Sequence, residues 1–298
     1  MRFLHCSDVH ITADYRALPL RRLGWRRWLA LPELLAGGRA RAYDAAAHTL
    51  SAIVQSMPAQ GARHLILSGD LTSCALDSEF QGAREALGAL AEDRDRCTII
   101  PGNHDVYTPG SVRHRRFERY FGHLLESDLP EHQREGAFPF VRKVAADAAI
   151  VGLCSARVPP LPGISRGRIG PAQLDGLAAV VSDGRLAGRA LLVVVHHAPL
   201  KPEGTAATGP WGLSDGHALC ELLRGPRYAV LHGHIHRRFH HPATAERPHL
   251  FGAGSSTQAG QEGYWLIDVA AGQVTGGTLQ APPFPEARPR PRAADPAR

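Results

Sequence analysis

Acidic, amide and imidazole side chains gather in five short stretches of this sequence, each directly after an apolar run. The stretches read SDVH at 7–10, SGD at 68–70, PGNHD at 101–105, VVHHAP at 194–199 and HGHIH at 232–236. In the last of them, His234 and His236 are two residues apart, so an extended chain would point both imidazoles to one side. A metal ion would explain why both are there, but two histidines alone cannot hold one. The other stretches would have to supply the missing ligands.

These stretches together contain enough ligand types for two metal ions. A mixed nitrogen and oxygen set without thiolates suits Mn, Fe, Zn or Co. Seven ligands are too many for one open catalytic ion, whereas two ions about 3.5–4 Å apart, joined by one bridging carboxylate, would use them all. Such a pair can bind a phosphoryl group and lower the pKa of a bridging water. The candidate metal ligands are Asp8, His10, Asp70, Asn103, His197, His234 and His236.

The elements that must position these residues alternate between strand and helix patterns. Strands are expected at 2–8, 64–70, 97–105, 189–200, 228–236, 249–256 and 263–280, with a hairpin turning near Asp147. Helical patterns occupy 43–57, 77–93, about 111–122, and 171–184, where a proline stands in the first turn. The candidate ligands therefore fall at the carboxyl ends of strands, where α/β sheets place their sites.

Composition limits the class of protein and its surroundings. The chain has 298 residues, of which 44% are hydrophobic, and no apolar run is long enough to cross a bilayer. The first residues have no signal-peptide pattern. Five cysteines, odd in number and never spaced C-x-x-C, are typical of reduced thiols. We therefore expect a cytoplasmic protein with one domain over residues 1–280.

Positive charge is concentrated in two segments. Residues 16–41 carry seven Arg and one Glu, and the Pro/Arg-rich residues 281–298, expected to be a disordered tail, carry four Arg and two acids. The rest of the chain has a net charge of about −2, which makes nucleic acid an unlikely partner. Residues 16–41 must lie near the rim of the site because they follow the Asp8 loop. They are either a local cap over the sheet edge or a basic, tryptophan-containing rim for an anionic substrate or a membrane surface.

The order D-x-H, G-D, G-N-H-D, H-x-P, G-H-x-H from Asp8 to His236 resembles the calcineurin-like metallophosphoesterase superfamily. The bacterial cyclic-nucleotide phosphodiesterase-like members are the most similar. The resemblance implies an α/β fold of four layers, in which two mixed β-sheets are flanked by helices. It also implies hydrolysis of a phosphomonoester or phosphodiester, a small phosphoester substrate, by metal-bound hydroxide without a covalent enzyme intermediate.

The resemblance assigns a role to each matching residue. His104 would contact the phosphate and protonate or stabilise the leaving oxygen, and Asp105 would orient His104 from behind. Asp70 would bridge the two ions. Asp8, His10 and His236 would hold one ion, and Asn103, His197 and His234 would hold the other.

Three alternatives stay open at this stage. His196 and His197 are adjacent and would point to opposite faces of a continuing strand, and the His-x-Pro pattern favours His197 as the ligand. A DNA-repair-type nuclease of the same superfamily has similar motifs, but the body of this chain lacks basic charge. A non-catalytic scaffold with the same fold would not need a complete ligand set.

Overall fold

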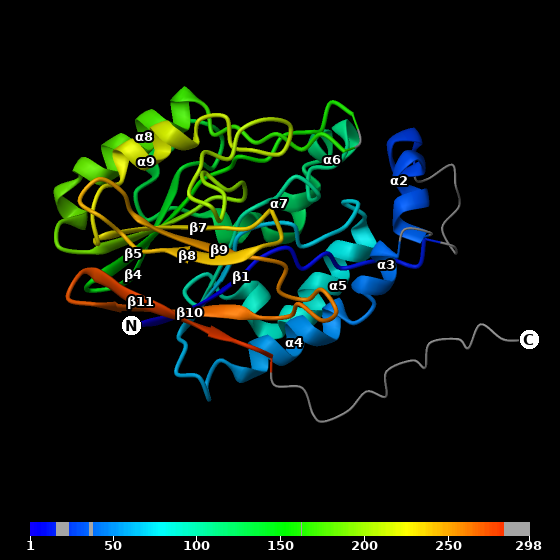
Figure 1. Cartoon of the computed structure of the whole chain (residues 1–298), viewed down its shortest axis with the longest axis horizontal. Coiled ribbons are helices and arrows are strands. Elements are labelled where there is room, and N and C mark those ends of the chain that lie inside the picture. The colour runs from blue at the N-terminus through cyan, green and yellow to red at the C-terminus, as the bar shows by residue number, and fades with distance from the viewer. Residues whose placement is uncertain (16–23, 36–37, 162, 283–298) are drawn as a thin grey trace, which may run out of the picture.

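Two β-sheets face each other in the computed structural model, which describes residues 1–15, 24–35, 38–161 and 163–282 (Figure 1). The first sheet has the order β11-β10-β1-β2-β3 in the described part of the chain, with β1, β2 and β3 parallel and β10 and β11 antiparallel to their neighbours. The sheet is therefore mixed, as expected. Its strands are β1 Arg2–Cys6, β2 His64–Leu67, β3 Cys97–Ile99, β10 Tyr264–Ala270 and β11 Gln273–Gln280.

The second sheet has the order β4-β5-β6-β7-β9-β8 among the described residues. Strands β5, β6, β7 and β9 are parallel, while β4 and β8 pair antiparallel at the two edges. The expected hairpin near Asp147 is confirmed, since β4 and β5 meet there. The strands are β4 Phe140–Ala145, β5 Ala148–Gly152, β6 Ala190–Val194, β7 Tyr228–His232, β8 Arg238–His241 and β9 His249–Ala253.

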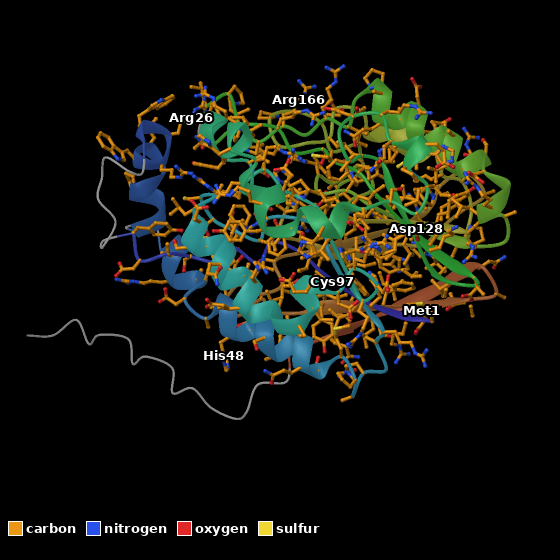
Figure 2. The ribbon with its side chains drawn as sticks, turned by 180° about the vertical axis from the view of Figure 1, so that it is seen from behind. Met1, Arg26, His48, Cys97, Asp128 and Arg166 are labelled. Atoms are coloured by element: carbon orange, nitrogen blue, oxygen red, sulfur yellow. The ribbon has the colours of Figure 1, made fainter. Side chains whose placement is uncertain are left out.

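Helices cover the outer face of each sheet, which gives the four layers that the resemblance implied. Helices α4 and α5 lie below the first sheet and α8 and α9 lie above the second (Figure 1). The view from behind, in which His48 marks α4, shows the same layers (Figure 2). The helices are α2 Trp25–Leu35, α3 Arg39–Ala42, α4 Ala46–Ser56, α5 Asp77–Leu87, α6 Pro109–Arg113, α7 Arg116–Phe121, α8 Pro171–Ser182 and α9 Gly216–Leu222, with short 3-10 turns at Gly88–Glu92, Gly122–Leu125, Pro130–His132 and Gly184–Leu186.

Side-chain alternation in the second sheet divides the hydrophobic core in two. Ile150 and Leu192 belong to the core between the sheets, which they share with Phe3 of β1. Their neighbours Val151 and Val193 point the other way and pack in a second core with α8 and α9. Successive strand residues face opposite sides of a sheet, so this pattern fixes which face meets which layer.

Parallel strands of both sheets end at the same edge of the molecule and position the candidate ligands. In the first sheet, β1, β2 and β3 end shortly before Asp8, Asp70 and Asn103. In the second sheet, β6 and β7 end shortly before His196 and His234. The hydrogen bond from the Gly233 N–H to the His196 carbonyl (3.0 Å) ties these two strand ends together.

Two expectations about helices need correction or restriction. The expected helix at about 111–122 is interrupted, because Arg115 has a left-handed backbone (φ 46°) that separates α6 from α7. Of the 16–41 segment, residues 16–23 and 36–37 lie outside the described residues, as do residues 283–298 of the expected tail. Within the part of the chain that the structure describes, no helix has the length and apolar character needed to cross a bilayer.

Candidate metal centre

The loops that carry the candidate ligands have strained backbones. Eight non-glycine residues among those described have a positive φ, and five of the eight are predicted ligands. A left-handed backbone costs roughly 1–2 kcal/mol for an ordinary residue, so strain of this kind is usually found where function requires it. The five ligands are Asp8 (52°), His10 (52°), Asp70 (54°), His234 (72°) and His236 (50°).

Glycines allow these loops to approach each other closely. A Cβ on Gly102 would overlap the Asp70 carboxylate and backbone, and a Cβ on Gly233 would overlap Ser7 and the Asp8 carboxylate. Any larger residue at either position would push a carboxylate out of place. The glycines before Asn103 and His234 are therefore part of the geometry of the site.

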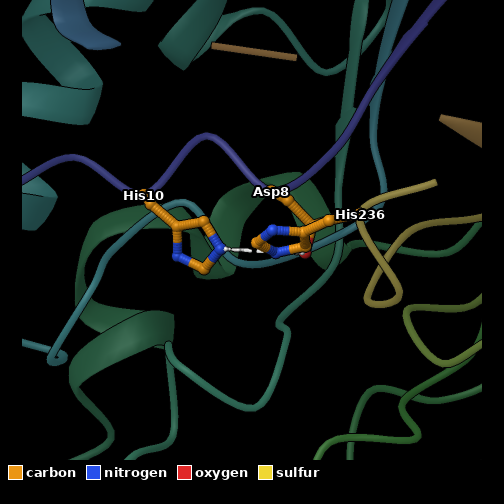
Figure 3. A group of neighbouring side chains, drawn as sticks. All are labelled: Asp8, His10 and His236. Atoms are coloured by element: carbon orange, nitrogen blue, oxygen red, sulfur yellow. Dashed lines mark hydrogen bonds and ion pairs between the residues drawn. The ribbon is translucent and has the colours of Figure 1, made fainter. Parts of the chain in front are cut away.

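Asp8, His10 and His236 form the first group of side chains that could hold a metal ion (Figure 3). The Nε2 atoms of the two histidines lie 3.1 Å apart, and Asp8 Oδ1 lies 3.2 Å from His236 Nε2 and 3.8 Å from His10 Nε2. Three ligand atoms thus converge on one point. All three residues were predicted, and the structure brings them together.

The second group consists of Asp70, Asn103, His196 and His234 around the next strand ends. His196 Nε2 lies 3.1 Å from Asn103 Oδ1 and 3.3 Å from Asp70 Oδ2. His196 Nδ1 donates to the Ser68 carbonyl (2.8 Å), which fixes the ring and leaves Nε2 as the atom that faces the ligands. The rings of His196 and His234 are 5.1 Å apart, and Asp70, His196 and His234 can share one ion.

One oxygen of Asp70 lies between the two groups. Oδ2 is 3.3 Å from His196 Nε2 and 3.9 Å from His10 Nε2. Oδ1 accepts a hydrogen bond from the His104 N–H (2.7 Å), which holds the carboxylate in this orientation. Asp70 therefore has the position that a bridging ligand requires.

The structure corrects the expectation that His197 is a ligand. Its Nδ1 contacts Ser155 Oγ (2.8 Å) and its Nε2 donates to the Ser165 carbonyl (2.9 Å), so both ring nitrogens are engaged away from Asp70. His196 takes the place predicted for His197. Strand β6 ends at Val194, so the alternation that assigned opposite faces to the two histidines no longer applies to them.

Carboxylates and imidazoles of opposite charge offset the effect of burial on each other's pKa in the two groups. Burial opposes ionisation of Asp70, yet the facing His196 and His104 hold its pKa well below the usual value. Burial likewise opposes ionisation of Asp8, but His236 keeps its pKa low. The pKa of His196 rises to about 9 because Asp70 outweighs the effect of burial.

By contrast, burial lowers the pKa of His234 to about 3, so this imidazole is neutral and able to donate a lone pair.

The side chains present fit a pair of divalent cations. Asp8 Oδ1 is buried and accepts no hydrogen bond from any described residue, although a buried carboxylate oxygen ordinarily requires a partner. The imidazole nitrogens of His10 and His236 face each other at 3.1 Å, which brings together two lone pairs unless a proton or a cation lies between them. Two cations would satisfy both features, and the nitrogen and oxygen donors suit Mn, Fe, Zn or Co.

His104 lies beside His10 and Asp70, whereas the Asp105 carboxylate does not contact the His104 ring as predicted. His104 Nδ1 donates to the Ser73 carbonyl (2.7 Å), and its ring lies 4.9 Å from that of His10. The Asp105 carboxylate instead accepts hydrogen bonds from the backbone N–H groups of Gly102 (2.9 Å) and Thr72 (3.0 Å). Asp105 therefore ties two loops together and does not orient the His104 ring directly. Burial and the nearby Asp70 raise its pKa to about 7.

A pocket of about 620 Å³ opens over the two groups and contains residues that the motifs did not reveal. The Tyr43 hydroxyl lies 3.3 Å from His236 Nδ1 and donates to Gln258 (3.2 Å), and Ser165 Oγ lies 3.4 Å from His234 Nε2. Trp211 forms part of the wall. The signal available for Tyr43 was its place after the 16–41 segment, which had to lie near the rim.

The comparison with protein families agrees with this site. A family model described as calcineurin-like phosphoesterase matches residues 1–238, which is most of the chain. The chain therefore belongs to the calcineurin-like phosphoesterase family, as the strand-end motifs indicated.

Individual relatives show how far the likeness extends. Glycerophosphodiester phosphodiesterase GpdQ of Enterobacter lignolyticus (strain SCF1) is 30% identical over 175 residues, which are 58% of this chain and 55% of that protein. The match thus spans about half the length of this relative. Among solved structures, a dimetal phosphatase from Danio rerio has a TM-score of 0.60 at 15% identity and covers 95% of this chain and 99% of its own. The protein TT1561 of Thermus thermophilus has a TM-score of 0.51 at 12% identity, with coverage of 94% and 98%. These two structures confirm the fold.

Proposed function

We propose that this protein is a phosphodiesterase that uses two divalent metal ions. The observation that carries the proposal is the position of Asp70 Oδ2 between two ligand groups at the base of an open pocket. Asp8, His10 and His236 would hold one ion, and Asn103, His196 and His234 would hold the other. When bound, such ions supply positive charge for a phosphoryl group and lower the pKa of a water molecule.

The protein's own residues orient the site and exchange protons with the substrate. His104 Nδ1 donates to the Ser73 carbonyl, so the proton that His104 can give to a leaving oxygen is the one on Nε2. Ser73 also donates from Oγ to the His10 carbonyl (3.1 Å), so one residue positions both histidines. The buried base of the pocket limits the access of bulk water to Asp8 and Asp70.

A phosphodiester is the substrate class we favour over a monoester. The relative with 30% identity is named as a glycerophosphodiester phosphodiesterase. The pocket wall at Trp211 and Gln258 also offers apolar and polar surface for the second ester group of a diester. Cyclic nucleotides and glycerophosphodiesters both belong to this class.

A substrate panel tests the proposal. The protein is stripped of metal, reloaded with Mn, Fe, Zn or Co, and assayed with bis-p-nitrophenyl phosphate, p-nitrophenyl phosphate, cyclic nucleotides, glycerophosphodiesters and supercoiled plasmid. We expect kcat/KM for small diesters to exceed that for the monoester by at least about tenfold, which corresponds to about 1.4 kcal/mol.

Two results would favour other functions. Plasmid nicking with little turnover of small diesters would support a nuclease. If no metal gave turnover of any ester, the protein would be a scaffold with the fold of a hydrolase.

A further inference from the structure

Helix α2 presents a stripe of four apolar side chains to solvent. Trp25, Trp28, Leu29 and Pro32 are spaced i, i+3, i+4 and i+7, which places them on one side of a helix, and all four are exposed. The exposed fractions of the first three are 56%, 47% and 59%. Helices of globular proteins normally turn such a stripe toward the core. These four side chains of α2 face solvent instead.

A buried arginine holds the helix in this orientation. Arg27 is only 8% exposed, and its guanidinium donates to the carbonyls of Cys74 (2.7 Å) and Ala75 (3.1 Å). Those carbonyls belong to the loop that begins at Asp70 and contains Ser73. The charged residue thus faces the protein while the tryptophans face outward, so the exposure of the stripe follows from a specific anchor.

Other exposed hydrophobic side chains lie beside this stripe. Seven large ones are exposed in the part of the chain that the structure describes, and only Leu279 on β11 belongs to a different region. Arg26 of α2 donates to the Pro159 carbonyl, two residues before Leu161. Trp211 Nε1 donates to the Gly163 carbonyl (2.7 Å). We call Trp25, Trp28, Leu29, Val112, Leu161 and Trp211 the α2 rim.

Helix α6, which carries Val112, lies next to α2 at the same edge (Figure 1). Val112 and Val158 line one groove, which connects this helix to the loop at Pro159. Trp211 belongs both to the α2 rim and to the wall of the pocket over the candidate metal centre. The pocket therefore opens on the side of the molecule where the α2 rim lies.

Positive charge accompanies these apolar side chains. Arg41 on α3, Arg113 next to Val112 on α6, and Arg166 in the loop after Leu161 are all exposed. Arg26 and Arg166 lie along the same edge of the molecule (Figure 2). Tryptophan prefers the boundary between water and lipid, and arginine next to it is attracted to anionic headgroups.

We propose that the α2 rim docks on an anionic lipid bilayer and turns the pocket toward the lipid surface. A second copy of this chain would suit the rim less well, because the exposed arginines beside the rim, such as Arg113 and Arg166, would then face their equivalents and repel them. A bilayer with anionic headgroups supplies both the apolar depth and the opposite charge. Docking does not depend on the proposed hydrolysis, so the two proposals can fail separately.

Vesicle binding by the full chain tests this proposal. The protein is sedimented with vesicles of phosphatidylcholine alone and of phosphatidylcholine mixed with phosphatidylglycerol. We expect binding to the anionic vesicles that weakens as salt is raised. The triple variant Trp25→Ser, Trp28→Ser, Leu29→Ser should bind about tenfold or more weakly. Leu279→Ser is the matched control, because it removes an exposed leucine from another region and should bind as the wild type does.

Two further readouts separate docking from misfolding and from catalysis. Hydrolysis of soluble bis-p-nitrophenyl phosphate should be the same in the triple variant and in Leu279→Ser. Brominated acyl chains should quench the wild-type tryptophan fluorescence and should quench that of the triple variant much less. The proposal is overturned if the wild type does not sediment with anionic vesicles, or if the triple variant binds these vesicles as tightly as the wild type does. It is also overturned if the wild type is a dimer that the triple variant dissociates.

Discussion

Two clusters of buried polar side chains stand at opposite ends of strand β2, and they differ in how their polar groups are satisfied. At the amino end, His64 Nδ1 donates to the Asp95 carbonyl (2.9 Å) and Nε2 accepts from the Thr98 hydroxyl (2.8 Å). Thr98 Oγ1 in turn accepts from Arg142 Nη1 (2.8 Å). Beyond the carboxyl end, Asp70 belongs to the candidate metal centre.

The metal centre differs from the His64 cluster in two ways: its backbone is strained, and one of its buried acceptors has no donor. The His64 cluster lies on strands with ordinary φ values, and each acceptor named in it has a donor, although Arg142 Nε donates to no described residue. In the metal centre, five ligands have a positive φ and Asp8 Oδ1 accepts no hydrogen bond from a described residue. Burial of a histidine is therefore a poor guide to function, whereas strain together with an unsatisfied acceptor indicates a site suited to a ligand.

The largest expected effect comes from Asp70. Asp70→Asn preserves the shape of the side chain but removes the bridging charge, so kcat/KM for a small diester should fall by on the order of 10³-fold. The unfolding temperature of the metal-free protein should change little in comparison. Near wild-type activity in Asp70→Asn would show that Oδ2 does not bridge two ions.

The adjacent histidines provide a matched pair. His196→Ala should lower kcat/KM by on the order of 10²-fold because it removes a metal ligand, while His197→Ala should lower it by about tenfold or less. Metal analysis of the two variants should show a loss of bound metal only for His196→Ala. The reverse order of the two effects would restore His197 as the ligand.

His104 should affect the chemical step more than metal binding. His104→Ala should lower kcat by about 10²-fold, and the loss should grow as the leaving group becomes more basic. Bound metal should stay at the wild-type level. A loss that is the same for all leaving groups would argue against proton transfer from His104.

The His64 cluster should respond in the opposite way. Thr98→Val removes the hydroxyl between His64 and Arg142, which should lower the free energy of unfolding by about 1–3 kcal/mol. The kcat for a small diester should remain unchanged at a temperature where the variant is folded. Denaturant unfolding and steady-state kinetics on the same sample measure both effects. A large loss of kcat in Thr98→Val would contradict the prediction that the His64 cluster affects stability alone.

The sequence predicted much of the site because its ligands follow strands whose ends are easily recognised. Asp8, Asp70 and His234 each come directly after an apolar run, and parallel strands bring such positions to one edge. The alternation of strands and helices indicated an α/β fold, and the resemblance to the family implied its four layers. The cytoplasmic location and the single domain over residues 1–280 stay predictions.

The parts of the site that the sequence did not predict depend on tertiary contacts, which local sequence patterns do not reveal. The His-x-Pro pattern favoured His197, but β6 ends at Val194 and the chain bends at His196 and His197, so only tertiary contacts decide which ring faces Asp70. Asp105 was assigned to His104 because of its place in the motif, but backbone N–H groups from a different loop bind its carboxylate. Tyr43 reaches His236 from 193 residues away in the chain, which no spacing rule anticipates.

Anomalous diffraction from crystals soaked in Mn tests the central claim most directly. The account predicts two peaks per chain, roughly 3.5–4 Å apart, with Asp70 Oδ2 between them and His196 rather than His197 next to one of them. A single peak, or peaks remote from Asp70, would contradict it.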